Sequence, residues 1–170
     1  LLPTVREARA DISQTQRAEI VKEKQAVGKQ EAQQMLVADV KSANYSGKSF
    51  EDMVLYLNRY GGMTRTEAVA HSLKYIVEAQ DNGRLSDKDV DKIFSETHSP
   101  TKLPVAQAFP DQIAKARKDI AKQRYDNDLL EDKMNEQNAM NLAQEAITMM
   151  DKDGNYKRAT VIAEAEQFRL

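Results

Sequence analysis

The sequence predicts an all-α protein: long helices and a small bundle of short helices, with a repeat-like helical hairpin at the C-terminus. Residues that favour strands and turns are scarce, since the 170 residues include 6 Gly, 4 Pro and no Trp, and aromatic residues make up 6%. Ala, Gln, Glu, Lys, Met and Leu, which lose little side-chain entropy in a helix, are abundant. Helix-capping residues also recur along the chain and divide it into segments.

The first predicted domain, residues 1–45, is one long helix. Thr4 is placed to cap it, and the helical pattern runs from Val5 to Ala43, where a loop sequence follows. Gly28 weakens this helix by about 1 kcal/mol relative to Ala and marks a candidate bend. The apolar residues form only a thin stripe: Val5, Ala8, Ile12, Ile20, Val27, Leu36 and Val40.

The second predicted domain, residues 46–97, is a compact core of three short helices. Ser49 is predicted to cap the first, from Phe50 to Tyr60. Thr64 and Glu67 form a capping box that opens the second, which ends at Ala79, and Ser86 is predicted to cap the third. The predicted core residues are Met53, Val54, Leu57, Val69, Leu73, Ile76, Val90, Ile93 and Phe94.

Residues 98–110 are predicted to be a Pro-containing linker, because the residue before each proline disfavours helix. The last predicted domain, residues 111–170, begins with a helix that Asp111 caps and that continues to Met150. At 1.5 Å per residue this helix is a rod of about 60 Å. Its heptad seam contains amides, which set register at a cost in stability, so the rod is predicted to need a partner. The predicted interface residues are Ile113, Ala116, Ile120, Gln123, Asn127, Leu130, Met134, Gln137 and Asn141.

The helical hairpin is predicted where Asp153-Gly154-Asn155 turns the chain into a last helix from Tyr156. The segment 154–159 resembles the turn of a tetratricopeptide repeat, in which Gly lets two helices meet closely and Ala permits close crossing. Met150 and Glu166 depart from the repeat pattern. A generic helical hairpin is therefore the favoured interpretation.

No catalytic, cofactor or metal site is predicted, and the chain is not expected to be an enzyme. There are two histidines and no cysteine, and we interpret His71 as a helix-surface residue and His98 as a loop residue. Gly61-Gly62 precedes a helix, but no phosphate-loop motif follows. The 25 basic and 27 acidic residues are well mixed, which argues against sequence-specific nucleic-acid binding. No apolar run is long enough to span a membrane, and no signal-peptide pattern is present.

A calcium loop is the one metal site that the spacing suggests. Glu78, Gln80, Asn82 and Asp89 fall at ligand positions of an EF-hand, with Gly83 at the glycine position. The closing residue is Asp rather than Glu, and the third position is an amide. A helix–turn–helix corner, with Asn82-Gly83 ending one helix and Ser86 capping the next, is the favoured alternative.

The chain resembles the internal virion proteins, or ejection proteins, of short-tailed bacteriophages. The resemblance lies in the Gln/Ala-rich segment 30–40, the mixed-charge rod 111–150, the turn at 151–154, and the lack of Cys and Trp. It implies a segment packed with other copies of itself and with neighbouring virion proteins, including the portal, in a multimeric core of the virion interior. It further implies that the protein leaves with the genome and acts in the host cell envelope. Large family members include a murein-cleaving domain, but no motif of one is found here.

Two alternatives belong to other functional classes. One is a cellular, cytoplasmic helical-repeat scaffold or adaptor that binds protein partners, and the other is a calcium-responsive module. The chain begins at Leu1 without an initiator Met and stops at Leu170 within a helical pattern. We therefore expect it to be part of a longer protein.

Overall fold

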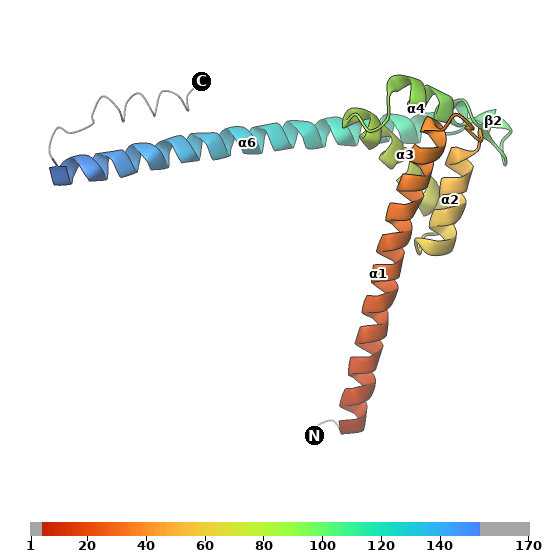
Figure 1. Cartoon of the computed structure of the whole chain (residues 1–170), viewed down its shortest axis with the longest axis horizontal. Helices are drawn as coiled ribbons and strands as arrows, with labels where there is room; N and C mark the ends of the chain where they lie inside the picture. The colour runs from red at the N-terminus through yellow and green to blue at the C-terminus, as the bar shows by residue number, and fades with distance from the viewer. Residues whose placement is uncertain (1–4, 154–170) are drawn as a thin grey trace. The chain divides into compact units, whose positions relative to one another are not determined.

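The computed structural model describes the backbone of residues 5–153 and the side chains of residues 5 and 13–150. This part of the chain is almost entirely helical (Figure 1), which confirms the all-α prediction. Two short strands, β1 and β2, form an antiparallel hairpin in which Thr97 pairs with Pro104 and His98 with Leu103. The helices are α1 Val5–Lys41, α2 Ser49–Tyr60, α3 Arg65–Asp81, α4 Asp87–Phe94, α5 Val105–Ala108 and α6 Pro110–Asp153; the strands are β1 Thr97–His98 and β2 Leu103–Pro104.

The chain divides into two compact units, Leu1–Lys118 and Asp119–Leu170. The first contains α1 to α5 and the first residues of α6, and the second contains the rest of α6. The division into four domains stays a prediction. The predicted cap at Thr4 and the predicted helical hairpin after Asp153 lie outside the described residues.

The core of the first unit lies among α1, α2, α3 and α4. All nine core residues predicted from the short helices are buried, none more than 7% exposed, so that prediction is confirmed. The C-terminal part of α1 joins this core through Ala32, Leu36 and Val40, which recur at four-residue intervals and so lie on one face of the helix. No described side chain between residues 13 and 27 is buried. Only the C-terminal part of α1 is therefore held by this core.

Gly28 lies where α1 closely approaches the end of α2. In Figure 1, α2 runs alongside the C-terminal part of α1. A Cβ atom at position 28 would lie 2.6 Å from the carbonyl oxygen of Tyr60, at the end of α2. The glycine thus permits close packing of two helices. The sequence had suggested a bend at this position, not a helix contact.

The predicted caps of α3 and α4 are confirmed. The N–H of Glu67 donates to Thr64 Oγ1 at 3.2 Å, the N–H of Asp89 donates to Ser86 Oγ at 3.1 Å, and both reciprocal carboxylate bonds are present.

The predicted caps of the other two helices are wrong. Ser49 is the first residue of α2, and Lys48 at the N-cap makes no side-chain capping bond. α6 begins at Pro110, with Asp111 in its first turn. Proline suits the first helical position because its missing N–H would have no partner in the helix.

Residues 98–110, predicted to be a Pro-containing linker, have secondary structure of their own. This segment contains most of the β1–β2 hairpin, then α5, and His98 and Val105 are buried. The N–H of Val105 donates to the carbonyl oxygen of Glu96 at 2.9 Å, which ties the hairpin to the end of α4. Pro104 precedes α5 and Pro110 begins α6, and the segment packs into the first unit.

Candidate functional site

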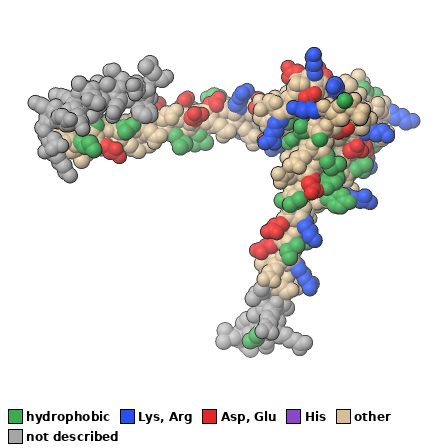
Figure 2. All heavy atoms as spheres, viewed as in Figure 1, with side chains coloured by type: hydrophobic (Ala, Val, Ile, Leu, Met, Phe, Trp, Pro, Cys, Tyr) green, Lys and Arg blue, Asp and Glu red, His purple; other side chains and the backbone are tan. Residues whose placement is uncertain are grey.

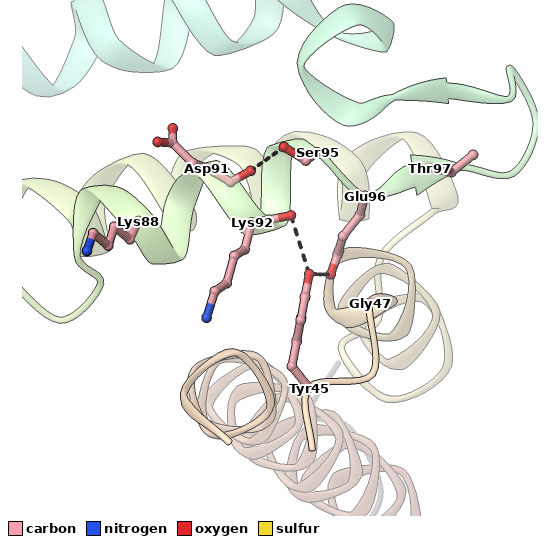
Figure 3. Close-up of a pocket in the computed structure, with 8 residues that line it drawn as sticks. All are labelled: Tyr45, Gly47, Lys88, Asp91, Lys92, Ser95, Glu96 and Thr97. Atoms are coloured by element: carbon pink, nitrogen blue, oxygen red, sulfur yellow. Dashed lines mark hydrogen bonds between the residues drawn. The ribbon is translucent and has the colours of Figure 1, made fainter. Parts of the chain in front are cut away.

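A pocket of about 680 Å³ opens between the α1–α2 loop and the end of α4 (Figure 3). Tyr45 and Gly47 line it from the loop, and α4 and the residues after it line the opposite side. The complete lining is Tyr45, Gly47, Lys88, Asp91, Lys92, Ser95, Glu96 and Thr97. This is the pocket whose geometry can be followed residue by residue.

Glu96 is a buried carboxylate at this site, and its oxygens accept hydrogen bonds from several donors. The N–H of Ser49 and its hydroxyl donate to Oε1 at 2.8 and 2.5 Å, and the N–H of Phe50 donates to Oε2 at 2.8 Å. These N–H groups belong to the first turn of α2. The N–H groups of a first turn have no acceptor within their own helix. Glu96 therefore supplies the cap of α2 from 47 residues away in sequence, and its charge complements the positive end of the helix dipole.

Tyr45 completes the bonding of Glu96. Figure 3 shows its ring reaching from the α1–α2 loop, with the hydroxyl donating to Glu96 Oε1 and lying 3.4 Å from the carbonyl oxygen of Lys92. Burial and the bond to the Glu96 carboxylate raise the pKa of Tyr45 far above its ordinary value of 10.0. The phenol thus remains a proton donor to Glu96 at neutral pH. The Lys92 ammonium lies 5.9 Å from the centre of the Tyr45 ring, within cation–π range.

A second polar cluster joins α2, α3 and β1. Arg65 Nη2 lies 2.8 Å from Glu51 Oε1, and His98 Nδ1 lies 3.7 Å from Glu51 Oε2. The last two atoms are buried and have no hydrogen-bond partner. The His98 ring packs at 4.8 Å from Phe109 and 6.5 Å from Phe50. His98 is therefore a buried residue, contrary to its interpretation as a loop histidine, because the hairpin folds it inward.

His71 is half-buried in α3 rather than freely exposed. Burial lowers its pKa, and the nearby positive charges of Lys29 and Lys74 lower it further. Its Nε2 atom is buried without a hydrogen-bond partner. Burial and the charge environment thus favour neutral His71 in the folded chain.

A shallow groove of about 540 Å³ lies on the outer side of α1 and α2. Met35 and Leu55 on its walls are 45% and 48% exposed, and the rings of Tyr56 and Tyr60 are in contact, tilted at 48° with their centres 4.7 Å apart. Tyr56 donates a hydrogen bond to Glu31 of α1, which holds the phenol in place. This groove is an apolar and aromatic surface that the first unit itself leaves uncovered.

The predicted interface of α6 divides into two parts. Ile113, Ala116 and Ile120 are buried, at 6–7% exposure, so these three cannot meet a partner without rearrangement. Ile113 and Ala116 belong to the first unit, whereas Ile120 belongs to the second. The interface as a whole stays a prediction. The remaining residues, Gln123, Asn127, Leu130, Met134, Gln137 and Asn141, are all exposed. Gln137 Nε2 donates to Asn141 Oδ1 at 3.1 Å, so these amides are satisfied along the helix surface.

The calcium-loop candidates form the corner between α3 and α4. Asn82 Oδ1 accepts from the N–H of Arg84 at 3.1 Å, and Asp89 Oδ2 accepts from the N–H of Ser86 at 3.0 Å. Gln80 Nε2 donates to Asp87 Oδ1 at 3.0 Å, while Glu78 lies within α3. Gly83 has a φ of +81°, the left-handed conformation that ends many helices. The candidate ligands thus hold a helical corner, and the described residues contain no group of three or more His, Cys, Asp or Glu side chains that could hold a metal.

No pattern in the sequence singles out Tyr45 or Glu96. A Glu just after a short helix and a Tyr in a loop are common, and no local spacing links either to the start of α2. They come together because α4 packs against α1, which places Glu96 beside the start of α2.

Comparison with protein-family models, curated proteins and solved structures yields no match. Within the described residues, no helix is both long enough and apolar enough to cross a membrane.

Proposed function

We propose that this chain is an assembly segment, which acts through helix surfaces that other protein chains cover. The observation that carries the proposal is the exposure of large apolar side chains on two long helices. On α6 these include Leu130, Met134 and Met140, at 58%, 63% and 67% exposure. Ile20, Val21 and Val27 on α1 are each at least 50% exposed. Burying such a side chain contributes roughly 1.5–3 kcal/mol, so a partner helix would gain substantially from these surfaces.

The energetics of single helices support the same proposal. Most helical stability in proteins comes from packing of an apolar face rather than from intrinsic propensity. Between residues 121 and 138 every side chain of α6 is exposed, so this stretch has no packed face of its own. A binding partner would supply the burial that the chain lacks here.

Charge distribution fits protein partners better than nucleic acid. On the face that Figure 2 shows, acidic and basic side chains both occur along the helices rather than forming one large patch of a single sign. Phosphate binding needs such a basic patch, and the net charge of the chain is −2. Mixed charge instead favours contacts with other mixed-charge helices.

The resemblance to phage ejection proteins gives the proposal its specific form. In that form the segment packs with other copies and with neighbouring virion proteins around the portal, and later acts in the host envelope. What supports it is the style of the sequence together with the uncovered long helices. No catalytic step is part of the proposal.

The groove between α1 and α2 favours a second candidate function, that of an adaptor. The contacting rings of Tyr56 and Tyr60, beside Leu55 and Met35, offer the aromatic contact area that peptide-binding surfaces use. An adaptor would bind one helical peptide there while α6 remained uncovered.

Thermal melting and particle imaging separate the two functions. For an assembly segment, circular dichroism of the purified 170-residue chain should show a broad transition whose midpoint rises with protein concentration. Electron microscopy of the assembled parent protein should show copies arranged around a common axis. A sharp, concentration-independent, two-state transition of a monomer would contradict the assembly function and favour the adaptor.

A further inference from the structure

The second unit carries an apolar stripe on α6 that differs from the predicted seam. Its positions are spaced alternately by four and three residues, the spacing that keeps side chains on one side of a coiled-coil helix. Leu129, Met140 and Ile147 are 43%, 67% and 55% exposed, and Ala143 is partly exposed. The whole stripe is Leu129, Lys133, Glu136, Met140, Ala143 and Ile147.

Two opposite charges occupy the middle of this stripe. Lys133 and Glu136 are both exposed, and neither forms an ion pair among the described residues. A charge at a seam position is unfavourable against an apolar side chain but favourable against an opposite charge. The partner of this stripe must therefore place an acid opposite Lys133 and a base opposite Glu136.

A second copy of the same helix meets this requirement when it runs antiparallel. If Leu129 of one copy lies opposite Met140 of the other, then Lys133 lies opposite Glu136, and each pair occurs twice by symmetry. In the next layers Ala143 faces Asp126, which is an unfavourable contact by the same rule. Ile147 faces the long aliphatic stem of Lys122, which can extend its charge outward. All of these layers follow from one register.

Other self-pairings are unfavourable for stated reasons. A parallel pair would place Lys133 against Lys133 and Glu136 against Glu136, and such like-charge contacts are destabilising. An antiparallel pair shifted by one heptad would place Lys133 against Ala143 and Glu136 against Met140, which leaves both charges without a partner. Of these arrangements, only the antiparallel pair with Leu129 opposite Met140 gives both Lys133 and Glu136 an opposite charge.

We propose that α6 pairs with α6 of a second copy, antiparallel, through this stripe, with reciprocal Lys133–Glu136 contacts at its centre. The proposal rests on the assembly function above and identifies one of its partners. Leu130 and Gln137 flank the stripe, so residues of the predicted interface would line the edge of the pair rather than its centre.

Charge reversal tests the pairing. Lys133→Glu and Glu136→Lys should each weaken self-association of the full 170-residue chain by roughly tenfold or more, because each replaces two attractive contacts with two repulsive ones. An equimolar mixture of these two variants should associate, since every facing pair is then opposite in charge. Glu131→Lys, an exposed change on the opposite side of the helix, is the control and should leave the dissociation constant unchanged. Sedimentation equilibrium measures all four samples.

Cysteine crosslinking tests the orientation, and the absence of native cysteine makes it unambiguous. A mixture of Leu129→Cys and Met140→Cys chains should form an interchain disulfide on oxidation, whereas neither variant should crosslink to itself. Self-crosslinking of Leu129→Cys would overturn the antiparallel arrangement. Equal association of wild type and both charge-reversal variants would overturn the stripe as the interface.

A monomeric wild-type chain at every concentration tested would also overturn the pairing. In that case, the hydrogen-exchange rate of the monomer decides whether the proposed assembly function is contradicted as well as the pairing. Fast exchange in residues 121–138 would leave α6 in need of a different partner, so the assembly function would stand. Slow exchange there would contradict both proposals.

Discussion

At the scale of single residues, the described structure depends on side chains that act far from their own position in the chain. Glu96 caps a helix that begins 47 residues earlier, and Tyr45 secures that carboxylate with its hydroxyl. His98 and Glu51 face each other with buried polar atoms that lack hydrogen bonds. Glu96 and Tyr45 stabilise the start of α2, so their removal has predictable consequences.

We predict that Glu96→Ala destabilises the chain by on the order of 3 kcal/mol, because it leaves the buried donors of Ser49 and Phe50 without an acceptor. Glu96→Gln keeps an acceptor oxygen and should cost less, while Tyr45→Phe should cost about 1 kcal/mol. Urea unfolding followed by circular dichroism measures the three values. Glu78→Ala, at an exposed position of α3, is the control, and a similar loss there would contradict the capping role.

The lowered pKa of His71 predicts a pH dependence of stability. Below its ordinary pKa of 6.5 the unfolded chain binds a proton that the folded chain resists, so the free energy of unfolding falls as the pH drops below that value. His71→Gln should remove this part of the dependence. Unfolding of both proteins near neutral pH and about two units lower measures it. The pKa of Asp89 is also lowered, from its ordinary value of 3.8, so its effect on the free energy of unfolding appears only at more acid pH. Parallel pH profiles for the two proteins would refute the prediction.

At the scale of secondary-structure elements, helix ends and close helix crossings organise the first unit. The capping boxes of α3 and α4 are local, whereas the cap of α2 comes from Glu96, two residues after the end of α4. The β1–β2 hairpin turns the Pro-containing segment back onto the core and buries Val105. Where the backbones of two helices are in contact, such an arrangement leaves little room for a larger side chain.

We predict that Gly28→Ala destabilises the chain, although Ala is the better helix former by about 1 kcal/mol. The added Cβ would lie 2.6 Å from the Tyr60 carbonyl oxygen, so α1 and α2 would have to move apart, at a cost of roughly 1–3 kcal/mol. Thermal or urea unfolding measures the net change. Gln30→Ala, an exposed position on α1, is the matched control and should be neutral or slightly stabilising. A more stable Gly28→Ala variant would show that the two helices are not held at this distance.

At the scale of the whole molecule, the two units differ in how much of their own surface they bury. The first unit has a continuous apolar core, whereas the described side chains of the second are mostly exposed. Local stability follows the density of buried apolar contacts. The two units should therefore differ in their opening free energies.

We predict that amide hydrogens in residues 121–138 exchange with solvent much faster than those of α2 and α3 in the isolated chain. Burial of α6 against a partner should slow their exchange, whereas amides around Leu73 and Ile76 should change little. Hydrogen exchange with mass spectrometry at low and high protein concentration measures this directly. Uniform protection of both units in a dilute sample would contradict it.

The sequence by itself determined the helical class, the capping boxes at Thr64 and Ser86, and the buried faces that contain Leu73, Ile76 and Ile93. These features follow from interactions within a few residues of the chain and from the helical period, both of which are visible in one dimension. Only the tertiary structure decided that Glu96 caps α2, that Gly28 meets Tyr60, that His98 turns inward, and that Ile113 and Ala116 are already covered. Each of these depends on contact between segments far apart in sequence, and no local pattern encodes which distant group will be the partner.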